Sequence, residues 1–383
     1  MDRSGRANPL FNANRLKLGT FCTNTTLSMT TVPEVWRPSW SNIEAAAVMA
    51  DRAGLEAIVP LARWKGYVDN APEHFTNTVQ EAFTFAAAVA QATKYSAVFT
   101  TTHAPMFHPL VAAKQAATID HISGGRFALN VVGGWNRREF EMFGLPLLEH
   151  SERYAYLRDW LKVVKALWQA PGEIDWDSKY FKMKRAVCRP RPIQQPCPPI
   201  MNAGLSREGM SFATENADIA FVNLIGDDPA AWRTQIAEYK DLARKHQGLA
   251  MQVWTNVQVV QAETTAVAEK YLKHYADDFR DHRAVDGFFT GLMAESRGPS
   301  NPTVEEVMRA RLAAGGNVLV GDADGIAARL RAMSDAGIDG VLMSFVNFLE
   351  GLAPFISGVL PLLEQVGLRA PFAGAPGPMA RAT

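Results

Sequence analysis

Polar and small residues gather after two short apolar runs in the middle of the sequence. The first run, Ala97–Thr101, leads to His103, and the second, Arg126–Val132, contains Asn130. A helical pattern over Pro109–Ile122 separates the two runs, which predicts a strand–helix–strand unit with parallel strands. Because the carboxyl ends of parallel strands meet at one edge of a sheet, these polar groups indicate a ligand site.

The alternation of side chains along each strand sorts these residues by face. Thr101 and His103 point to the same side of one strand, and Ala128 and Asn130 point to the same side of the other. The small Ala128 leaves room for a flat ring, and the Asn130 amide offers a donor and an acceptor. His103 could act as a base or as a hydrogen-bond donor to a substrate. The plainer interpretations are strand propensity for Thr101, a structural role for a lone histidine, and loop stabilisation by Asn130.

Two later helices begin with residues that can hold a phosphate. Ser206 follows a predicted strand and Gly204, so its hydroxyl and the free N–H groups of a helix start could bind an anion. Arg153 and Tyr154 open another helix, and an arginine can contact a phosphate in a bidentate manner. A plain helix cap at Ser206 and a surface arginine beside a packing tyrosine are the alternatives.

Two further charged residues follow predicted strands. Glu139 comes shortly after a Gly-Gly pair and could accept from a ring N–H or hydroxyl, or pair with Arg137 or Arg138. Arg63 follows the predicted strand Glu56–Leu61, where it could offer charge to an anionic group or lie in solvent.

Eight apolar segments alternate with helical patterns and are expected to position these residues. They are Lys17–Cys22, Glu56–Leu61, Ala97–Thr101, Arg126–Val132, Pro199–Ala203, Asp218–Asn223, Met251–Val260 and Gly340–Phe345. This alternation predicts an α/β fold, a (β/α)8 TIM barrel. An open doubly wound sheet is the second choice, although no GxGxxG follows the first strand.

The remaining segments complete the predicted domain organisation. Residues 17–366 form one barrel domain, with irregular insertions at about 171–199, after strand 4, and at about 277–317, after strand 7. Residues 1–16 read as a flexible arm and residues 367–383 as a disordered tail.

Composition limits the class of protein. The 383 residues carry no formal net charge and are 48% hydrophobic, as is ordinary for a soluble enzyme with a large core. Clustered Lys and Arg for nucleic acid, an apolar run for a membrane span and an apolar signal core are not found, so the expected location is the cytoplasm. The 3 cysteines have no metal-binding spacing, so no metal site is expected.

Several motifs resemble those of the bacterial-luciferase-like flavin-dependent monooxygenases. The quoted segments are SGGRFALNVVGGW, EMFG, HSERYAYL, NAGLSREG and GVLMSFVNF. The resemblance spans about residues 17–366 and is strongest to the branch of pyrimidine monooxygenase and dimethyl sulfone monooxygenase. It implies a TIM barrel that binds reduced FMN at the carboxyl ends of its strands. The FMN contacts that it implies are Ala62, Arg63, Asn130, Glu139, Arg153, Tyr154 and Ser206. It places dioxygen beside Thr101 and Asn130.

The resemblance also implies a two-component reaction. A separate NAD(P)H-dependent flavin reductase supplies reduced FMN, and dioxygen then oxidises a small organic substrate with cleavage of a C–N, C–S or C–halogen bond. Ala62-Arg63 and His103 depart from the pyrimidine enzyme's pattern, which suggests another electrophile, with a pyrimidine- or pyridine-like N-heterocycle favoured. Relatives of this kind imply a homodimer or homotetramer.

Two other functions are open at this point. A deazaflavin-dependent dehydrogenase or reductase would need more basic residues near the phosphate site than Arg153 alone. A non-catalytic flavin-binding protein would not need the Thr101 and Asn130 pair.

Overall fold

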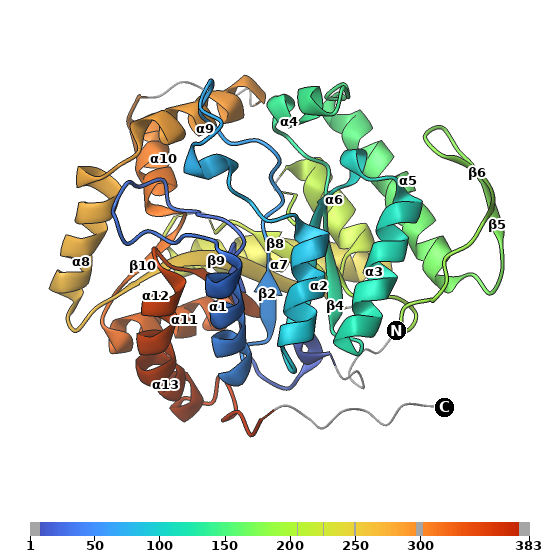
Figure 1. Ribbon diagram of the computed structural model, residues 1–383. Helices are drawn as coiled ribbons and strands as arrows, with labels where there is room; N and C mark the ends of the chain where they lie inside the picture. The colour runs from blue at the N-terminus through green and yellow to red at the C-terminus, as the bar shows by residue number, and fades with distance from the viewer. Residues whose placement is uncertain (1–7, 205, 225, 249, 296–301, 375–383) are drawn as a thin grey trace.

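Eight parallel strands close into a barrel at the centre of the molecule (Figure 1). The structure is a computed structural model that describes residues 8–204, 206–224, 226–248, 250–295 and 302–374. Strand β9 closes the barrel because it pairs with β11 on one side and with β8 on the other. The barrel strands are β1 (Lys17–Phe21), β2 (Ala57–Val59), β3 (Ala97–His103), β4 (Phe127–Val132), β7 (Ile200–Asn202), β8 (Ile219–Val222), β9 (Gln252–Gln261) and β11 (Gly340–Ser344). The predicted (β/α)8 barrel is confirmed, and the open sheet is wrong.

Helices surround the barrel and connect each strand to the next parallel one. The helices of this outer layer are α1 (Trp40–Arg52), α2 (Ala82–Ala92), α3 (Pro109–Ser123), α5 (His150–Gln169), α6 (Arg207–Asn216), α7 (Pro229–Gln247), α8 (Thr265–Lys273), α11 (Ala323–Asp335), α12 (Phe348–Pro354) and α13 (Leu360–Gln365). A short helix, α4 (Arg137–Met142), lies between β4 and α5. Within the described ranges, each helix is too short or too polar to cross a bilayer.

The central strand–helix–strand unit shows how local sequence sets these boundaries. Helix α3 starts at Pro109, whose fixed φ suits a first helical position. The His108 ring caps this end by accepting a hydrogen bond from the Leu110 N–H at 3.2 Å. The helix ends at Gly124, whose φ of +68° lies in the left-handed region that favours glycine. β4 can then return parallel to β3.

The barrel interior is apolar in its middle and polar at the carboxyl ends of the strands. Phe99 of β3 and Ala128 of β4 point inward and are fully buried. The same alternation carries Thr101, His103 and Asn130 to inward positions closer to the carboxyl ends of their strands. A packed interior thus forms the floor of the mouth, as the alternation predicted.

The first insertion follows β4, the fourth barrel strand. It contains an antiparallel hairpin of β5 (Ile174–Asp177) and β6 (Lys182–Ala186), which projects from the barrel beside α5 in Figure 1.

The second insertion follows β9, the seventh barrel strand, and is helical where a glycine-rich loop was predicted. It contains α9 (His282–Glu295), α10 (Pro302–Ala314) and an additional parallel strand, β10 (Val318–Gly321). A Cβ on Gly287 would lie 1.8 Å from the Tyr67 carbonyl oxygen. Gly287 therefore lets α9 approach the segment that contains Tyr67 closely. In the sequence this glycine read as a loop residue. Residues 296–301 of the predicted insertion lie outside the described residues.

Both terminal segments differ from the predicted flexible arm and disordered tail. Residues 8–16 and 367–374 are the described parts of these segments, and they contain the buried side chains of Leu10, Leu16, Leu368 and Arg369. Arg369 forms an ion pair of 2.6 Å with Glu56. The two segments therefore close the amino-terminal end of the barrel; residues 1–7 and 375–383 lie outside the described residues.

Candidate active site

Thr101 and Asn130 are hydrogen-bonded to each other at the carboxyl end of the barrel. They are register partners on β3 and β4, and Nδ2 of Asn130 lies 3.1 Å from Oγ1 of Thr101. Thr101 Oγ1 also lies 2.6 Å from the Pro60 carbonyl oxygen, so the hydroxyl must donate there. It can then only accept from Asn130, which fixes the orientation of the amide. The carbonyl Oδ1 of Asn130 is buried and finds no hydrogen-bond partner among the described residues.

His103 lies on the same face of β3 and is buried. Its Nδ1 is 3.4 Å from Oε2 of Glu139, and no residue in the described ranges hydrogen-bonds this nitrogen. Burial lowers the pKa of His103, and the negative charge of Glu139 offsets only part of this effect. His103 is therefore neutral at pH 7, which is the form that can accept a proton.

Glu139 holds the loop that follows β2. Its Oε1 accepts hydrogen bonds from the backbone N–H groups of Trp64 at 2.7 Å and Lys65 at 3.3 Å. Arg138, which the sequence suggested as a partner of Glu139, instead pairs with Asp69 at 3.1 Å. Glu139 thus joins α4 to the loop after β2, and its second oxygen remains directed at His103.

Arg63 is buried in the same loop, so the interpretation of a solvated charge is wrong. Its guanidinium donates to Thr25 Oγ1 at 2.6 Å and to the Tyr67 hydroxyl at 3.3 Å. Its Nε finds no partner in the part of the chain that the structure describes. Ala62 precedes it and is half-buried. The Ala62-Arg63 loop therefore borders the mouth at the end of β2.

The residues with phosphate-binding chemistry lie at the starts of α5 and α6. Nη1 of Arg153 donates to the Gly134 carbonyl at 2.8 Å, and its buried Nε is unpaired within the described ranges. The Tyr154 hydroxyl hydrogen-bonds the Ser206 side chain, and burial raises the pKa of this tyrosine. Ser206 caps α6, because its Oγ accepts from the Gly209 N–H at 3.0 Å. Tyr154 and Ser206 are therefore in contact, and Arg153 lies one residue before Tyr154 at the start of α5.

Aromatic side chains cover this end of the barrel. The ring of Phe288 on α9 meets the ring of Tyr67 at 4.8 Å and the ring of Trp135 at 5.2 Å between centroids. The neighbouring Phe289 is buried instead beneath the Arg309 guanidinium. Only Phe288 of this pair contacts the rings beside the mouth.

Gln258 of β9 is a buried polar residue that sequence reading missed. It shares the inward face of β9 with Asn256, and both polar atoms of its side chain lack a partner among the described residues. A Cβ on Gly315 would lie 2.8 Å from Gln258 Oε1 and 3.0 Å from Ser28 Oγ, so this glycine makes room for the amide. The sequence signal for Gln258 was the alternation of polar residues in QVWTNVQVVQ. It was overlooked because the segment as a whole reads as an apolar strand.

The mouth thus combines three chemical elements. The Asn130 amide offers hydrogen bonds to a flat ring, the starts of α5 and α6 can hold an anion, and His103 is a neutral base. Within the described ranges, no group of three or more metal-binding side chains is found.

Comparison with known proteins agrees with this fold. Residues 16–340 match the luciferase-like monooxygenases as a family. The chain is 29% identical to the FMNH2-dependent dimethylsulfone monooxygenase of Pseudomonas putida over 329 residues, 84% of this chain and 87% of that protein. It is 30% identical to the pyrimidine monooxygenase RutA of Enterobacter sp. strain 638 over 360 residues, 91% of this chain and 96% of that protein.

Among solved structures, the fold is similar to that of DmoA from Hyphomicrobium sulfonivorans. The TM-score is 0.80 at 19% identity, over 92% of this chain and 89% of that one. The family match covers most of the chain, and the relatives of similar length are monooxygenases. The chain therefore belongs to the luciferase-like monooxygenase family and is a flavin-dependent monooxygenase.

Proposed function

We propose that the enzyme uses reduced FMN and dioxygen to oxidise a small organic substrate, with cleavage of a C–N, C–S or C–halogen bond. A separate NAD(P)H-dependent flavin reductase supplies the reduced FMN. One relative is named for a sulfone and the other for a pyrimidine, which supports a small electrophilic substrate, with an N-heterocycle favoured. In this proposal the enzyme is a cytoplasmic homodimer or homotetramer with a single barrel domain.

The residues at the mouth fit FMN. Three buried polar atoms, Oδ1 of Asn130 and the Nε atoms of Arg63 and Arg153, have no partner in the described part of the chain. Buried polar groups are nearly always hydrogen-bonded, so these atoms indicate a ligand. In the proposal Arg153, Tyr154 and Ser206 hold the phosphate, and Ala62, Arg63, Asn130 and Glu139 border the ring.

The observation that carries the proposal is the fixed orientation of Asn130. When bound, reduced FMN supplies the electrons for activation of dioxygen. Thr101 locks the Asn130 amide through its own bond to Pro60, so the free carbonyl and the second N–H of Asn130 are preorganised at the mouth. Such preorganised dipoles stabilise developing charge without reorganisation.

Two other features of the chain support the reaction. The Tyr67, Trp135 and Phe288 rings exclude water from this end, which protects reactive species from hydrolysis. Neutral His103 is placed to take a proton from the substrate.

The substitutions Thr101→Val and Asn130→Leu test the proposal. We expect each to lower kcat by about 100-fold or more, as loss of a preorganised polar group does. Turnover is measured as oxygen uptake with a flavin reductase, NADH and a panel of pyrimidines, pyridines and sulfones. Anaerobic titration with reduced FMN measures cofactor binding separately.

Thr100→Val is the matched control. Thr100 precedes Thr101 on β3, is equally buried, and bonds outward to the Ala82 carbonyl at 3.3 Å. It should retain turnover. Wild-type turnover in Thr101→Val would remove the assigned role of the pair, and failure of the wild type to bind reduced FMN would contradict the choice of cofactor.

A further inference from the structure

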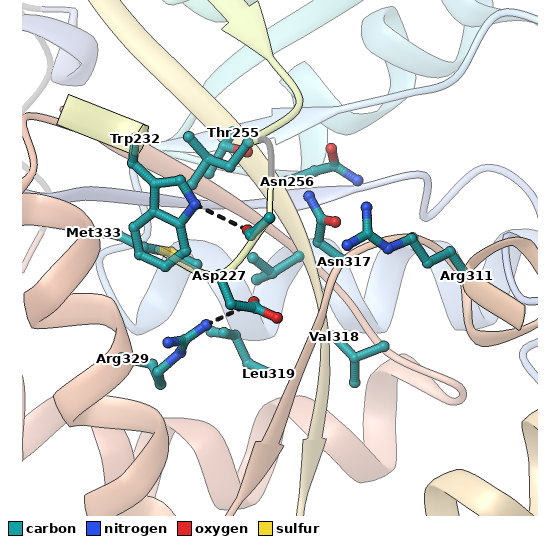
Figure 2. Close-up of a pocket in the computed structure, with 14 residues that line it drawn as sticks. Asp227, Trp232, Thr255, Asn256, Arg311, Asn317, Val318, Leu319, Arg329 and Met333 are labelled. Carbon is teal, nitrogen blue, oxygen red and sulfur yellow. Dashed lines mark hydrogen bonds and ion pairs between the residues drawn. The ribbon is translucent and has the colours of Figure 1, made fainter. Parts of the chain in front are cut away.

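A second cavity lies in the barrel wall, away from the residues assigned to FMN. It has a volume of about 220 Å³ and is shown in Figure 2. Strand β8 pairs with β9 as far as Thr255, and β10 pairs with β9 only from Gln258 onward. Asn256 and Val257 therefore have no strand partner on the side of β9 that faces β8 and β10. The cavity occupies this gap in the wall, between β8, β9, β10 and the helices α7, α10 and α11.

One end of the cavity carries polar groups without partners. The side chains of Asn256, Arg311 and Asn317 point toward one another in Figure 2. Arg311 is exposed and the two asparagines are half-buried, and within the described ranges their side chains make no hydrogen bond or ion pair. The Thr255 hydroxyl is fully buried and also unpartnered among the described residues. A guanidinium and two amides thus face one end of the cavity without satisfying one another, while the buried, unpartnered Thr255 hydroxyl lies beside Trp232. These groups suit a polar ligand, and a buried hydroxyl without a partner points the same way.

The charges at this cavity favour an anion. Asp227 is already paired with Arg329 at 3.0 Å, and this guanidinium lies over the Trp232 ring at 5.1 Å from its centroid. Arg311 has no such counter-ion in the described part of the chain, so the lining keeps one uncompensated positive charge. An arginine beside amide N–H groups matches the two oxygens of a carboxylate or the three of a sulfonate.

The opposite end of the cavity is lined mainly by apolar side chains, beside the neutralised pair of Asp227 and Arg329. Trp232, Met333, Leu319 and Val257 line it, and the Trp232 indole is held in place because its Nε1 donates to the Gly226 carbonyl at 3.0 Å. An apolar cavity of about 150 Å³ accommodates benzene. A volume of about 220 Å³ therefore suits one ring or a short chain with an acidic group.

We propose that this cavity binds a small organic anion, a carboxylate or sulfonate on a ring or short chain. The acidic group contacts Arg311, Asn256 and Asn317, and the apolar part packs against Trp232. None of the residues assigned to FMN lines this cavity, so the proposal does not depend on the flavin chemistry.

Titration calorimetry of the full chain with benzoate tests the proposal at low ionic strength. We expect millimolar or tighter binding by the wild type, at least tenfold weaker binding by Arg311→Met and by Asn317→Leu, and weak binding of neutral benzamide to all three. Arg331→Met is the matched control, since Arg331 is an exposed arginine of α11 outside the cavity, and it should bind benzoate as the wild type does.

Three results would overturn the proposal. They are no binding of benzoate or benzenesulfonate to the wild type, unchanged binding in Arg311→Met, and loss of benzoate binding when reduced FMN is bound under anaerobic conditions. The last result would make the cavity part of the flavin site. Unchanged benzoate affinity with reduced FMN bound would support two separate sites.

Discussion

The imidazole of His103 is buried at the carboxyl end of β3, 3.4 Å from the Glu139 carboxylate. Burial lowers the pKa of His103, and the charge of Glu139 offsets only part of this effect. The folded-state pKa therefore lies below the ordinary value of about 6.5. At pH values between the pKa of His103 in the folded chain and its pKa in the unfolded chain, the unfolded chain binds a proton that the folded chain does not. The free energy of unfolding should consequently fall as the pH is lowered through about 6.5, and should stop falling below the folded-state pKa.

Urea unfolding of the wild type and His103→Gln between pH 5 and pH 7.5 checks this expectation. The difference in stability between the two proteins should change in favour of His103→Gln as the pH falls. A constant difference across this range would show that His103 titrates alike in both states, contrary to its burial.

Residue types revealed part of the site without the fold. The strand period of two already placed Thr101 with His103 on one face of β3, and Ala128 with Asn130 on one face of β4, whereas the register that pairs Thr101 with Asn130 came from the structure. The destinations of Glu139 and Arg63 could not be read in this way. Glu139 bonds to Trp64, 75 positions away, and Arg63 to Thr25, 38 positions away, so neither contact has a local signal.

Among the elements, β4 is anchored at its amino-terminal end by Arg126. The buried guanidinium donates to four backbone carbonyls and one hydroxyl, those of Ala90, Thr93, Ser96 and Ser123 and the Thr93 side chain. These acceptors join the ends of α2 and α3 and the start of β3. Burial lowers the pKa of Arg126, and the negative charge of Asp51 offsets part of this effect. A buried charge of this kind is tolerated only when it is hydrogen-bonded or paired.

Arg126→Met should reduce the free energy of unfolding by at least about 3 kcal/mol, because it leaves buried acceptors unpaired. Arg126→Lys should recover less than half of this loss, since an ammonium group lacks the planar fork. Urea unfolding measures both. Turnover per folded molecule should be unchanged in both variants, because Arg126 lies at the amino-terminal end of the barrel, opposite the mouth. Full recovery by lysine would mean that charge alone matters here.

The elements themselves were predicted unevenly. Apolar strands between helical patterns gave the barrel, since that pattern is local and repeated. Helix α9 was missed because Gly287 and Gly291 read as loop residues, whereas Gly287 serves a close contact with Tyr67. β10 was missed because Val318–Gly321 is short and directly precedes the cap of α11.

For the whole molecule, the pair of Glu56 and Arg369 closes the chain on itself. Their side chains are 0% and 2% exposed, and Arg369 also donates to the carbonyls of Leu16 and Gly54. Glu56 in turn accepts from the Leu18 N–H at 2.8 Å. Segments at both ends of the described chain thus meet at one buried charge pair.

Arg369→Gln should lower the free energy of unfolding by about 3–5 kcal/mol, because it leaves the Glu56 carboxylate buried and uncompensated. Arg15→Gln is the control, since it breaks the exposed pair with Asp335 and should cost less than about 1 kcal/mol. Thermal and urea unfolding compare the two. Equal, small losses would mean that the carboxyl-terminal segment contributes little to the fold.

The sequence by itself determined the barrel and which residues share a face within β3 and within β4, and it predicted the residues able to hold a phosphate. These features depend on residue type and on the repeat of two residues in a strand and 3.6 in a helix, which can be read from a few neighbouring positions in the sequence. Only the tertiary structure decided the contacts of Glu139 and Arg63, the unpaired amide of Gln258 and the cavity beside Arg311. Each depends on segments distant in sequence, and free polar atoms are recognised only after every possible partner has been placed.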